Sequence, residues 1–353
     1  MKGVVLAGGK GSRLRPFTYS GAKQLVPIGN TPVLHFPVRQ LVAAGITDIA
    51  LVVGDTEAQI RGAMGDGTAF GARFTYIRQE APLGIAHALG LCRDFAGGAP
   101  VVLYLGDNVL LGGIGPLVDA FRASGAEGAV VLKEVEDPRA FGVAELAGER
   151  LARVVEKPAE PPTRLAVIGV YAFRPRVFDV IAGLAPSGRG EYEITDAING
   201  LLEAGHRVDT LVSTDHWIDT GKMEDMLAAN RAVLGMLEPA ADVAADIDGA
   251  SIVTGPVTIG QGAVLRRAEV RGPAAIGPGA VVEDARIGPN VAIGAGCRIT
   301  RSAIAESIVM EETVIEDCPG VEHSMIGRYA RVASAPAGSR LTLGDHSRFE
   351  GPA

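Results

Sequence analysis

Aliphatic residues return at steps near six from about Ile247 to Val332, and this period constrains the fold more than any other feature of the chain. A hexapeptide period is typical of a parallel β-helix, in which each turn stacks on the last and aliphatic side chains fill the axis. Interruptions of five residues, and one of four between Ile304 and Ile308, predict an irregular coil of roughly four or five turns. Glycine often follows the aliphatic residue, where we expect it to permit corners with positive φ. The pairs are Ile259-Gly260, Ile276-Gly277, Ile287-Gly288, Ile293-Gly294 and Ile326-Gly327.

The chain before this region alternates short β-branched runs with segments of helix length, which is the pattern of a mostly parallel sheet covered by helices. A length of 353 residues also favours two domains. We therefore predict an α/β protein with a Rossmann-like domain at 1–238, followed by a β-helix domain with a C-terminal tail at 239–353. Predicted strands are Gly3–Ala7, Asp48–Val53, Phe74–Arg78, Pro100–Leu105, Ala129–Val135, Leu151–Glu156 and Leu165–Phe173. Predicted helices are Thr31–Ala44, Gly84–Phe95, Ile114–Ser124, Glu193–Glu203 and Lys222–Leu237.

Charge is distributed unevenly along the chain. The formal net charge is −8, which argues against a general nucleic-acid binder. Residues 1–47 nevertheless contain no Asp or Glu, which favours the binding of a small polyanion there, with chance clustering as the alternative. The basic residues of this segment are Lys2, Lys10, Arg13, Arg15, Lys23 and Arg39.

Neither a membrane span nor a disulfide framework is predicted. No apolar run approaches the ~20 residues needed to cross a bilayer. The cysteines Cys92, Cys297 and Cys318 are few and scattered, and they have no metal-ligand spacing. We therefore expect a cytoplasmic protein.

A glycine-rich loop, Leu6-Ala7-Gly8-Gly9-Lys10-Gly11-Ser12-Arg13, follows the first predicted strand. Glycine lets the backbone approach a ligand and direct its N–H groups at phosphate oxygens, whose charge Lys10 and Arg13 can neutralise. The loop is no dinucleotide fingerprint, because Leu14 replaces the third glycine and no acid precedes Asp48. It is no Walker loop either, because Lys10 is followed by glycine. A turn without a ligand is the remaining alternative.

Polar residues at the ends of later apolar runs complete the candidate site. Asp107 follows one such run and Asp219 another, so both are candidate Mg²⁺ ligands, although Asp107 could instead cap a helix. Glu156 could accept hydrogen bonds from sugar hydroxyls and Lys157 could contact a sugar phosphate, unless the two form only a surface ion pair. Lys23 shares the basic segment, which favours a contact with phosphate.

Taken together, these segments resemble the nucleotidylyltransferases that activate sugar 1-phosphates. The chain is most similar to the thymidylyl-transferring branch, in its long form with an added left-handed β-helix. The resemblance covers essentially the whole chain. It is carried, in order, by L-A-G-G-x-G-S-R-L-x-P, K-Q-L-x-P, P-L-G-I-A-H-A, G-D-N, F-G-V, E-K-P, E-I-T-D-A-I and W-I-D-T-G.

The resemblance implies a Mg²⁺-dependent enzyme that takes dTTP and glucose 1-phosphate, with homo-oligomer formation through the β-helix as a further expectation. Two departures from the short thymidylyl form concern the sugar site: Phe141 stands where Tyr often precedes the glycine, and Leu83 where Asp often precedes Gly84. The implied roles are nucleotide binding by Gly8 and the adjoining loop with Leu6, Gly9 and Gly11, triphosphate binding by Arg13 and Lys23, and substrate binding by Asn108. Gln79 and Gly84, with Gln24 nearby, are implied to read the pyrimidine, Asp107 and Asp219 to bind Mg²⁺, and Gly142, Glu156, Lys157 and Val170 to border the sugar phosphate.

Three alternatives remain open at this point. The first is an enzyme that uses UTP or both pyrimidine triphosphates. The second is a bifunctional protein whose β-helix also acetylates amino-sugar phosphates, for which His323 is the one histidine inside the coil region. The third is a non-catalytic regulatory relative, although such proteins tend to lose the residues that Arg13, Lys23, Asp107 and Asp219 represent here.

Overall fold

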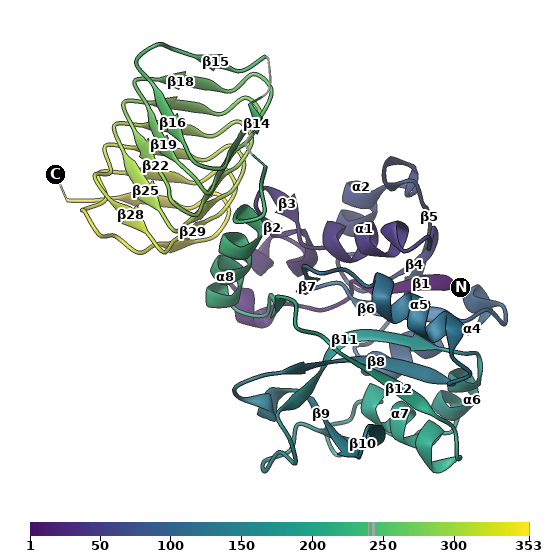
Figure 1. The fold of residues 1–353 in the computed structure, drawn as a ribbon. Coiled ribbons are helices and arrows are strands. Elements are labelled where there is room, and N and C mark those ends of the chain that lie inside the picture. Colours follow the sequence, from purple (N-terminus) through teal and green to yellow (C-terminus); the bar gives the residue numbers. More distant parts are fainter. Residues whose placement is uncertain (239, 242–243, 353) are drawn as a thin grey trace. The chain divides into compact units, whose positions relative to one another are not determined.

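The computed structural model describes residues 1–238, 240–241 and 244–352 (Figure 1). It divides into two compact units that do not follow chain order. Unit 1 comprises 1–10 and 34–217, and unit 2 comprises 11–33 and 218–353. Residues 11–33 of the basic segment, with Arg13, Arg15 and Lys23, therefore belong to the same unit as the β-helix, whereas Lys2, Lys10 and Arg39 lie in unit 1. The predicted domain boundary stays a prediction, and Pro239, where it falls, lies outside the described residues.

Unit 1 contains a sheet with a parallel centre. Within the described residues, four neighbouring strands, β5-β4-β1-β6, run parallel, and β11 then pairs antiparallel with β6. The central strands are apolar on both faces because helices cover both, and Val4, Leu51 and Leu103 are fully buried. The strands are β1 Lys2–Leu6, β4 Asp48–Val53, β5 Arg73–Arg78, β6 Val101–Leu105, β7 Asn108–Leu110, β8 Gly128–Glu134, β9 Gly142–Ala147, β10 Arg150–Glu156, β11 Leu165–Phe173 and β12 Val208–Val212. The predicted α/β class with a mostly parallel central sheet is confirmed.

The helices of unit 1 follow the predicted pattern with two corrections. The predicted helix Thr31–Ala44 begins only at His35, because Thr31–Pro32 forms strand β3 and pairs with Pro27–Ile28, strand β2. The predicted helix Gly84–Phe95 is two helices. The helices are α1 His35–Ala43, α2 Glu57–Met64, α3 Ile85–Gly90, α4 Arg93–Ala96, α5 Gly115–Ala123, α6 Arg176–Ala182 and α7 Ile194–Glu203. In the part of the chain that the structure describes, every helix is too short or too polar to span a membrane.

Unit 2 is built on a parallel β-helix whose coils repeat about every 17 residues (Figure 1). Each of the first five coils contributes one strand to each of three faces. The inward column of the third face reads Val253, Val270, Ile287, Ile304 and Val321. The first face holds β14 Ala240–Ala241, β17 Val257–Ile259, β20 Ala274–Ile276, β23 Val291–Ile293, β26 Ile308–Val309, β29 Met325–Ile326 and β31 Thr342–Leu343. The second holds β15 Asp246–Ile247, β18 Val264–Arg266, β21 Val281–Glu283, β24 Arg298–Thr300, β27 Val314–Glu316, β30 Arg331–Ala333 and β32 Arg348–Glu350. The third holds β16 Ile252–Thr254, β19 Glu269–Arg271, β22 Arg286–Ile287, β25 Ala303–Ala305 and β28 Val321–Glu322.

The structure corrects two features of the predicted coil, namely its number of turns and the spacing of four residues between Ile304 and Ile308. Strands continue to Glu350, and among the described residues two faces hold seven strands each, so four or five turns was too few. The step of four between Ile304 and Ile308 does not exist in the interior. Val309 pairs with Ile293 in the inward column, whereas Ile308 pairs with the outward-facing Ala292.

Glycine at one corner of the coil serves a purpose other than the expected one. A Cβ at Gly277 would lie 2.6 Å from the backbone N of Ala295 in the next coil, and Gly260, Gly294 and Gly327 are confined in the same way. At these four positions glycine is required because a side chain would clash with the next coil, and not because the backbone has a positive φ. Of the five glycines named from the sequence, Gly288 alone has the expected conformation, at φ 106°.

The remaining elements of unit 2 cover one face of the coil. Helix α8, Met223–Leu234, packs on β23 and on β2 of the 11–33 segment. Asn230 is fully buried there, where it accepts a hydrogen bond from Gly29 N at 2.8 Å and donates to Asn290 O at 3.2 Å. The outward side chains of this face are buried, and they include Ala275, Ala292, Ile308 and Met325.

Candidate functional site

The glycine-rich loop of unit 1 starts at the carboxyl end of β1. A Cβ at Gly8 would lie 3.3 Å from Gly54 N, in the loop after the neighbouring strand β4. On the other side, Gly106 N donates to Leu6 O at 2.9 Å, so the loops after β1 and β6 also touch through their backbones. Gly9 is exposed at the tip. In open α/β sheets, ligands bind outside the carboxyl ends of the strands, which is where these three loops meet.

Asp107 lies in the loop after β6 and is oriented by its neighbour. Trp217 Nε1 donates to Asn108 Oδ1 at 2.7 Å, and Asn108 Nδ2 donates to Asp107 Oδ1 at 2.9 Å. Because an indole N–H can only donate, it fixes which side of the buried Asn108 amide faces the carboxylate. A strand, β7, follows Asp107 directly, so the helix-cap alternative is excluded.

Gln79 and Gly84 lie together, as the resemblance implied. Gln79 Nε2 is 3.2 Å from Gly84 O and 2.9 Å from His87 Nδ1. Gly84 has φ 103°, and a Cβ there would lie 2.4 Å from Tyr192 O, so only glycine fits at the start of α3.

Glu156 is the centre of a polar cluster at the end of β10. Gly142 lies opposite it in the β9–β10 register, and Lys157 Nζ lies 3.6 Å from Glu156 Oε1. Arg189 Nη2 donates to Oε1 at 3.2 Å, and Thr195 Oγ1 donates to Oε2 at 3.2 Å. The predicted Glu156–Lys157 ion pair exists, but it belongs to a larger group. Arg189 in this group also pairs with Glu193 at 2.8 Å and with Glu191 at 3.4 Å. Val170 is fully buried on β11, opposite Tyr104.

Unit 2 holds the other predicted residues. Lys23 is almost completely buried, with its side chain 6% exposed, and its Nζ lies 4.0 Å from Asp219 Oδ1. A Cβ at Gly11 would lie 2.8 Å from Lys23 Cβ, so the loop passes directly over this side chain. A Cβ at Gly221 would lie 2.9 Å from Arg13 Nη2 and 3.3 Å from Asp219 Oδ2. Arg13, Lys23 and Asp219 therefore lie around one short stretch of backbone.

The charge of Arg13 also affects an ionisable group at the start of α8, the Asp225 carboxyl. Burial raises the pKa of the Asp225 carboxyl, while the nearby positive charges of Lys222 and Arg13 act in the opposite direction. A basic guanidinium and a partly buried carboxyl thus adjoin the Lys23–Asp219 pair.

Gln24 is buried with one hydrogen-bonding group unused. Its side chain is 2% exposed, and among the described residues no donor reaches Oε1. Leaving a buried acceptor unsatisfied costs about 1–3 kcal/mol. A ligand that donates a hydrogen bond to Oε1 would remove this cost when it binds.

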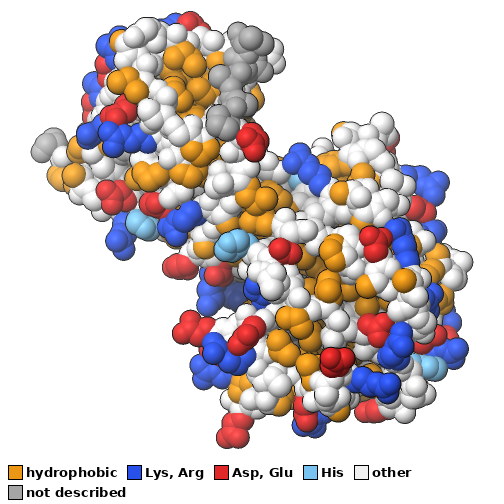
Figure 2. Space-filling model, in the orientation of Figure 1, with side chains coloured by type: hydrophobic (Ala, Val, Ile, Leu, Met, Phe, Trp, Pro, Cys, Tyr) orange, Lys and Arg blue, Asp and Glu red, His pale blue; other side chains and the backbone are white. Residues whose placement is uncertain are grey.

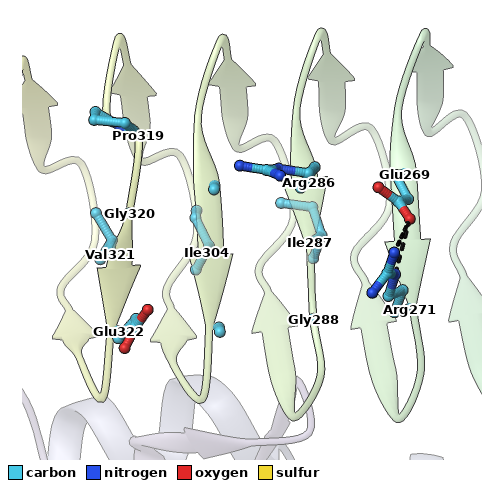
Figure 3. A pocket seen from close by; sticks show the side chains of 12 residues that line it. Glu269, Arg271, Arg286, Ile287, Gly288, Ile304, Pro319, Gly320, Val321 and Glu322 are labelled. Carbon is cyan, nitrogen blue, oxygen red and sulfur yellow. Dashed lines mark hydrogen bonds and ion pairs between the residues drawn. The ribbon is translucent and has the colours of Figure 1, made fainter. Parts of the chain in front are cut away.

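Outside these groups, the third face of the β-helix carries a surface hollow of about 270 Å³ (Figure 3). The residues that line it include Ala303 and Ala305, and two others of the lining interact, since Arg271 donates to Glu269 at 2.8 and 2.5 Å. No predicted site residue lines it. On the face shown in Figure 2, acidic and basic side chains are interspersed, and no large basic field appears.

Reasoning from the sequence missed four side chains that hold predicted residues in place. Thr195 and Trp217 lie within E-I-T-D-A-I and W-I-D-T-G, so the motifs pointed to them without giving them a role. His87 lies in P-L-G-I-A-H-A. Arg189 lies in no motif, and only folding brings it to Glu156.

Comparisons with known proteins agree with this picture. Residues 2–235 match the family model described as nucleotidyl transferase, and residues 270–337 match the one described as the GMPPB C-terminal domain. A glucose-1-phosphate thymidylyltransferase of Streptomyces griseus is 44% identical over 99% of both chains. The low-salt glycan biosynthesis nucleotidyltransferase of Haloferax volcanii is 43% identical over 99% of this chain and 100% of its own.

A solved structure extends the similarity to three dimensions. A Bacillus anthracis protein described as a glucose-1-phosphate thymidylyltransferase, in complex with a sucrose, is 39% identical with a TM-score of 0.63, covering 66% of this chain and 94% of its own. The resemblance predicted from short motifs is confirmed by alignment over the whole length. The chain belongs to the nucleotidyl transferase family.

Proposed function

We propose that this chain is a glucose-1-phosphate thymidylyltransferase, which converts dTTP and glucose 1-phosphate to dTDP-glucose and pyrophosphate. The observation that carries the proposal is the 44% identity over 99% of both chains with the Streptomyces griseus enzyme. The residues present support it: unit 1 holds Asp107, Glu156 and Lys157, and unit 2 holds Arg13, Lys23 and Asp219.

The unused Gln24 acceptor fits a base that carries a ring N–H. Thymine and uracil both carry a ring N–H that can donate to a carbonyl oxygen, and Gln24 Oε1 is buried without a donor among the described residues. Guanine carries a ring N–H as well, so this argument favours dTTP, UTP and GTP equally. The choice of dTTP rests on the relatives.

The reaction needs positioning and charge neutralisation more than proton transfer. A phosphate oxygen of the sugar 1-phosphate is already ionised at neutral pH, so it can attack the α-phosphorus without a general base. We assign Arg13 and Lys23 to the triphosphate, where they would offset the charge that builds up as pyrophosphate leaves. Lys157, held beside Glu156 at 3.6 Å, is assigned to the acceptor phosphate, and Arg189 on the same carboxylate adds a second cation.

Nucleotidyl transferases generally use a divalent metal, and we propose Mg²⁺ held by Asp107 and Asp219. Their carboxylates are the hard oxygen ligands that this ion prefers, and it commonly takes one or two protein carboxylates, with substrate phosphate oxygens completing the shell. Among the described residues there is no group of three or more His, Cys, Asp or Glu placed to hold a metal. When bound, the ion would neutralise phosphate charge and align the triphosphate.

A single panel tests the proposal. Pyrophosphate release is measured with dTTP, UTP, ATP and GTP, each against glucose 1-phosphate and several other sugar 1-phosphates. We expect the highest kcat/KM with dTTP and glucose 1-phosphate. Equal or faster turnover with UTP would favour the dual-specificity alternative, and no release with any pair would favour the non-catalytic one.

The acetylating alternative has its own assay. Thiol release from acetyl-CoA with glucosamine 1-phosphate would support it. His323, its candidate residue, lies exposed at a corner of the coil with φ 45°. We expect no thiol release.

We further propose that the chain forms a homo-oligomer through its β-helix. The first coil exposes apolar side chains, with Ile252 59% exposed and Ile247 and Val253 38% exposed. Light scattering at micromolar concentration tests this, and a monomer mass would contradict it. The cytoplasmic location stays a prediction, which cell fractionation would check.

A further inference from the structure

One corner of the β-helix changes character along the coil. Backbone hydrogen bonds between successive coils align the middle residues of this corner in one column. The column begins with Gln261, Pro278 and Ala295, which carry no charge, and ends with Glu311, Arg328 and Asp345. In this column, therefore, the first three positions are uncharged and the last three carry stacked charged side chains.

These charges are tied to one another. Asp345 Oδ1 accepts a hydrogen bond from Arg328 N at 2.8 Å, and Arg328 Nη1 lies 4.0 Å from Asp345 Oδ2. Arg328 Nε lies 2.9 Å from Glu311 Oε2, as an ion pair whose N–H lacks the alignment of a hydrogen bond. The Arg328 side chain is 27% exposed, and that of Asp345 is 9% exposed. Two carboxylates thus lie beside a partly buried guanidinium, and one of them also accepts a hydrogen bond from the backbone N of Arg328.

Arg328 and Asp345 also contact segment 11–25, which contains the two cations assigned to the triphosphate, Arg13 and Lys23. Arg328 Nη2 donates to Leu25 O at 3.2 Å, one residue beyond Gln24. Asp345 Oδ2 accepts a hydrogen bond from Ser20 Oγ at 2.7 Å. A Cβ at Gly344 would lie 3.0 Å from Pro16 Cβ, so the last coil touches this segment directly. Every one of these contacts lies inside unit 2.

We propose that Arg328, clamped by Glu311 and Asp345, is a positioning residue for segment 11–25, and that the β-helix thereby sets the affinity for the nucleoside triphosphate. Arg328 and Asp345 hold the segment at Leu25 and Ser20, on either side of Lys23. Lys23 in turn lies under Gly11, and Thr18 Oγ1 donates to Gly11 O at 2.8 Å, so the fixation extends back toward Arg13. The inference rests on the proposed function, since it concerns the binding of that enzyme's nucleotide.

The test separates the two substrates in the full-length enzyme. In Arg328→Ala we expect KM for dTTP to rise about tenfold, the size of one lost charge-assisted hydrogen bond. KM for glucose 1-phosphate should stay within about twofold of wild type, because Gly142, Glu156 and Lys157 belong to unit 1. Arg328→Lys keeps one charge but not the fork that reaches three partners, so it should recover part of the dTTP affinity. A change in stability alone would not produce this selective shift.

Two further variants complete the design. Arg301→Ala is the matched control, because Arg301 also sits at a β-helix corner but makes its hydrogen bonds to Asp317, at 2.6 and 2.8 Å, and it should leave both KM values unchanged. Ser20→Ala removes an exposed hydroxyl without threatening the fold, and should raise KM for dTTP about threefold. If Arg328→Ala does not fold, Ser20→Ala decides.

Unchanged KM for dTTP in Arg328→Ala, or in Ser20→Ala where the first variant does not fold, overturns the inference while the wild-type enzyme remains active. Equal rises for both substrates also overturn it. A wild-type enzyme that releases no pyrophosphate in the substrate panel contradicts the proposed function instead.

Discussion

At the scale of single residues, the sequence identified candidate site residues but did not predict how exposed each one is. Arg13 and Lys23 were identified by a basic segment free of acids, and the structure gives them different surroundings. Arg13 is exposed beside Gly221, whereas Lys23 is buried beside Asp219. The sequence could not foresee this difference, because the partner Asp219 is distant in the chain and burial depends on how the loop passes over Lys23.

Replacing Arg13 tests its proposed place on the triphosphate. We expect Arg13→Ala to lower kcat by about two orders of magnitude, the usual scale for loss of one electrostatic stabiliser. Steady-state pyrophosphate release measures it. Arg15→Ala is the matched control, because Arg15 is also exposed and lies over the Tyr19 ring at 4.9 Å. Near-normal turnover of purified Arg13→Ala would remove that residue from the proposed site.

Asp107→Asn should lower kcat by a similar factor, since Asp107 is a proposed metal ligand.

Gln24 offers a test in which stability and binding move in opposite directions. Gln24→Met keeps the approximate size of the side chain and removes a buried acceptor that has no donor among the described residues. We expect the free protein to be as stable as wild type or up to about 1 kcal/mol more stable, with a clearly higher KM for dTTP. Thermal melting and initial rates provide the two measurements. A less stable variant with normal KM would show that Gln24 has a structural role only.

At the scale of elements, strands and helices were predicted well where a local pattern defines them. Strand β4 matches its prediction at both ends, and helix α7 begins one residue later than expected. The start of α1 was wrong because Thr31–Pro32 pairs with another strand, and pairing between segments leaves no periodic signal. The interior step at Ile308 was wrong for a related reason, since two adjacent aliphatic residues cannot both face inward in a strand.

The first residue of α1 predicts a dependence of stability on pH. Burial, with the nearby Arg39 charge as a smaller cause, lowers the pKa of His35 to about 4. Its ring packs edge-on against Phe70 at 4.9 Å. The unfolded chain, with an ordinary pKa of about 6.5, takes up this proton first. Stability from the neutral ring is therefore present above pH 6.5 and is lost as the pH falls from 6.5 toward 4.

Thermal melts between pH 7.5 and 4 measure this effect, and His35→Gln should show a shallower loss of Tm across that window. His206→Gln is the control, since His206 lies in the loop between α7 and β12. Parallel pH profiles of wild type and His35→Gln would contradict the assignment.

At the scale of the whole molecule, the compact units differ from the order of the chain. Residues 11–33 and α8 pack on the β-helix and belong to its unit. The outward side chains of this face, Ile308 and Met325 among them, are buried, and α8 packs on strand β23 of the same face. Each such apolar side chain contributes about 1.5–3 kcal/mol when buried.

Removal of the β-helix should therefore damage the part that remains. We expect a chain ending at Glu238 to aggregate or to melt well below the full-length protein, because α8 and segment 11–33 would expose the surfaces that now pack on the coil. Circular dichroism melts and size-exclusion chromatography measure it. A truncated chain with the full-length Tm and normal KM for dTTP would show that the coil is dispensable.

The sequence by itself determined the elements and the kind of chemistry. Hexapeptide spacing predicts the coil because each strand must direct its aliphatic side chains inward at a fixed period, and the order of short motifs identified the family. The tertiary structure alone decided the burial of Lys23 and Gln24, the approach of Arg189 to Glu156, and the contact of Arg328 with Leu25. It also gave the corner glycines, Gly277 among them, a role in coil contact instead of backbone conformation. These outcomes depend on which distant segments pack together, and such packing leaves no local periodicity to read.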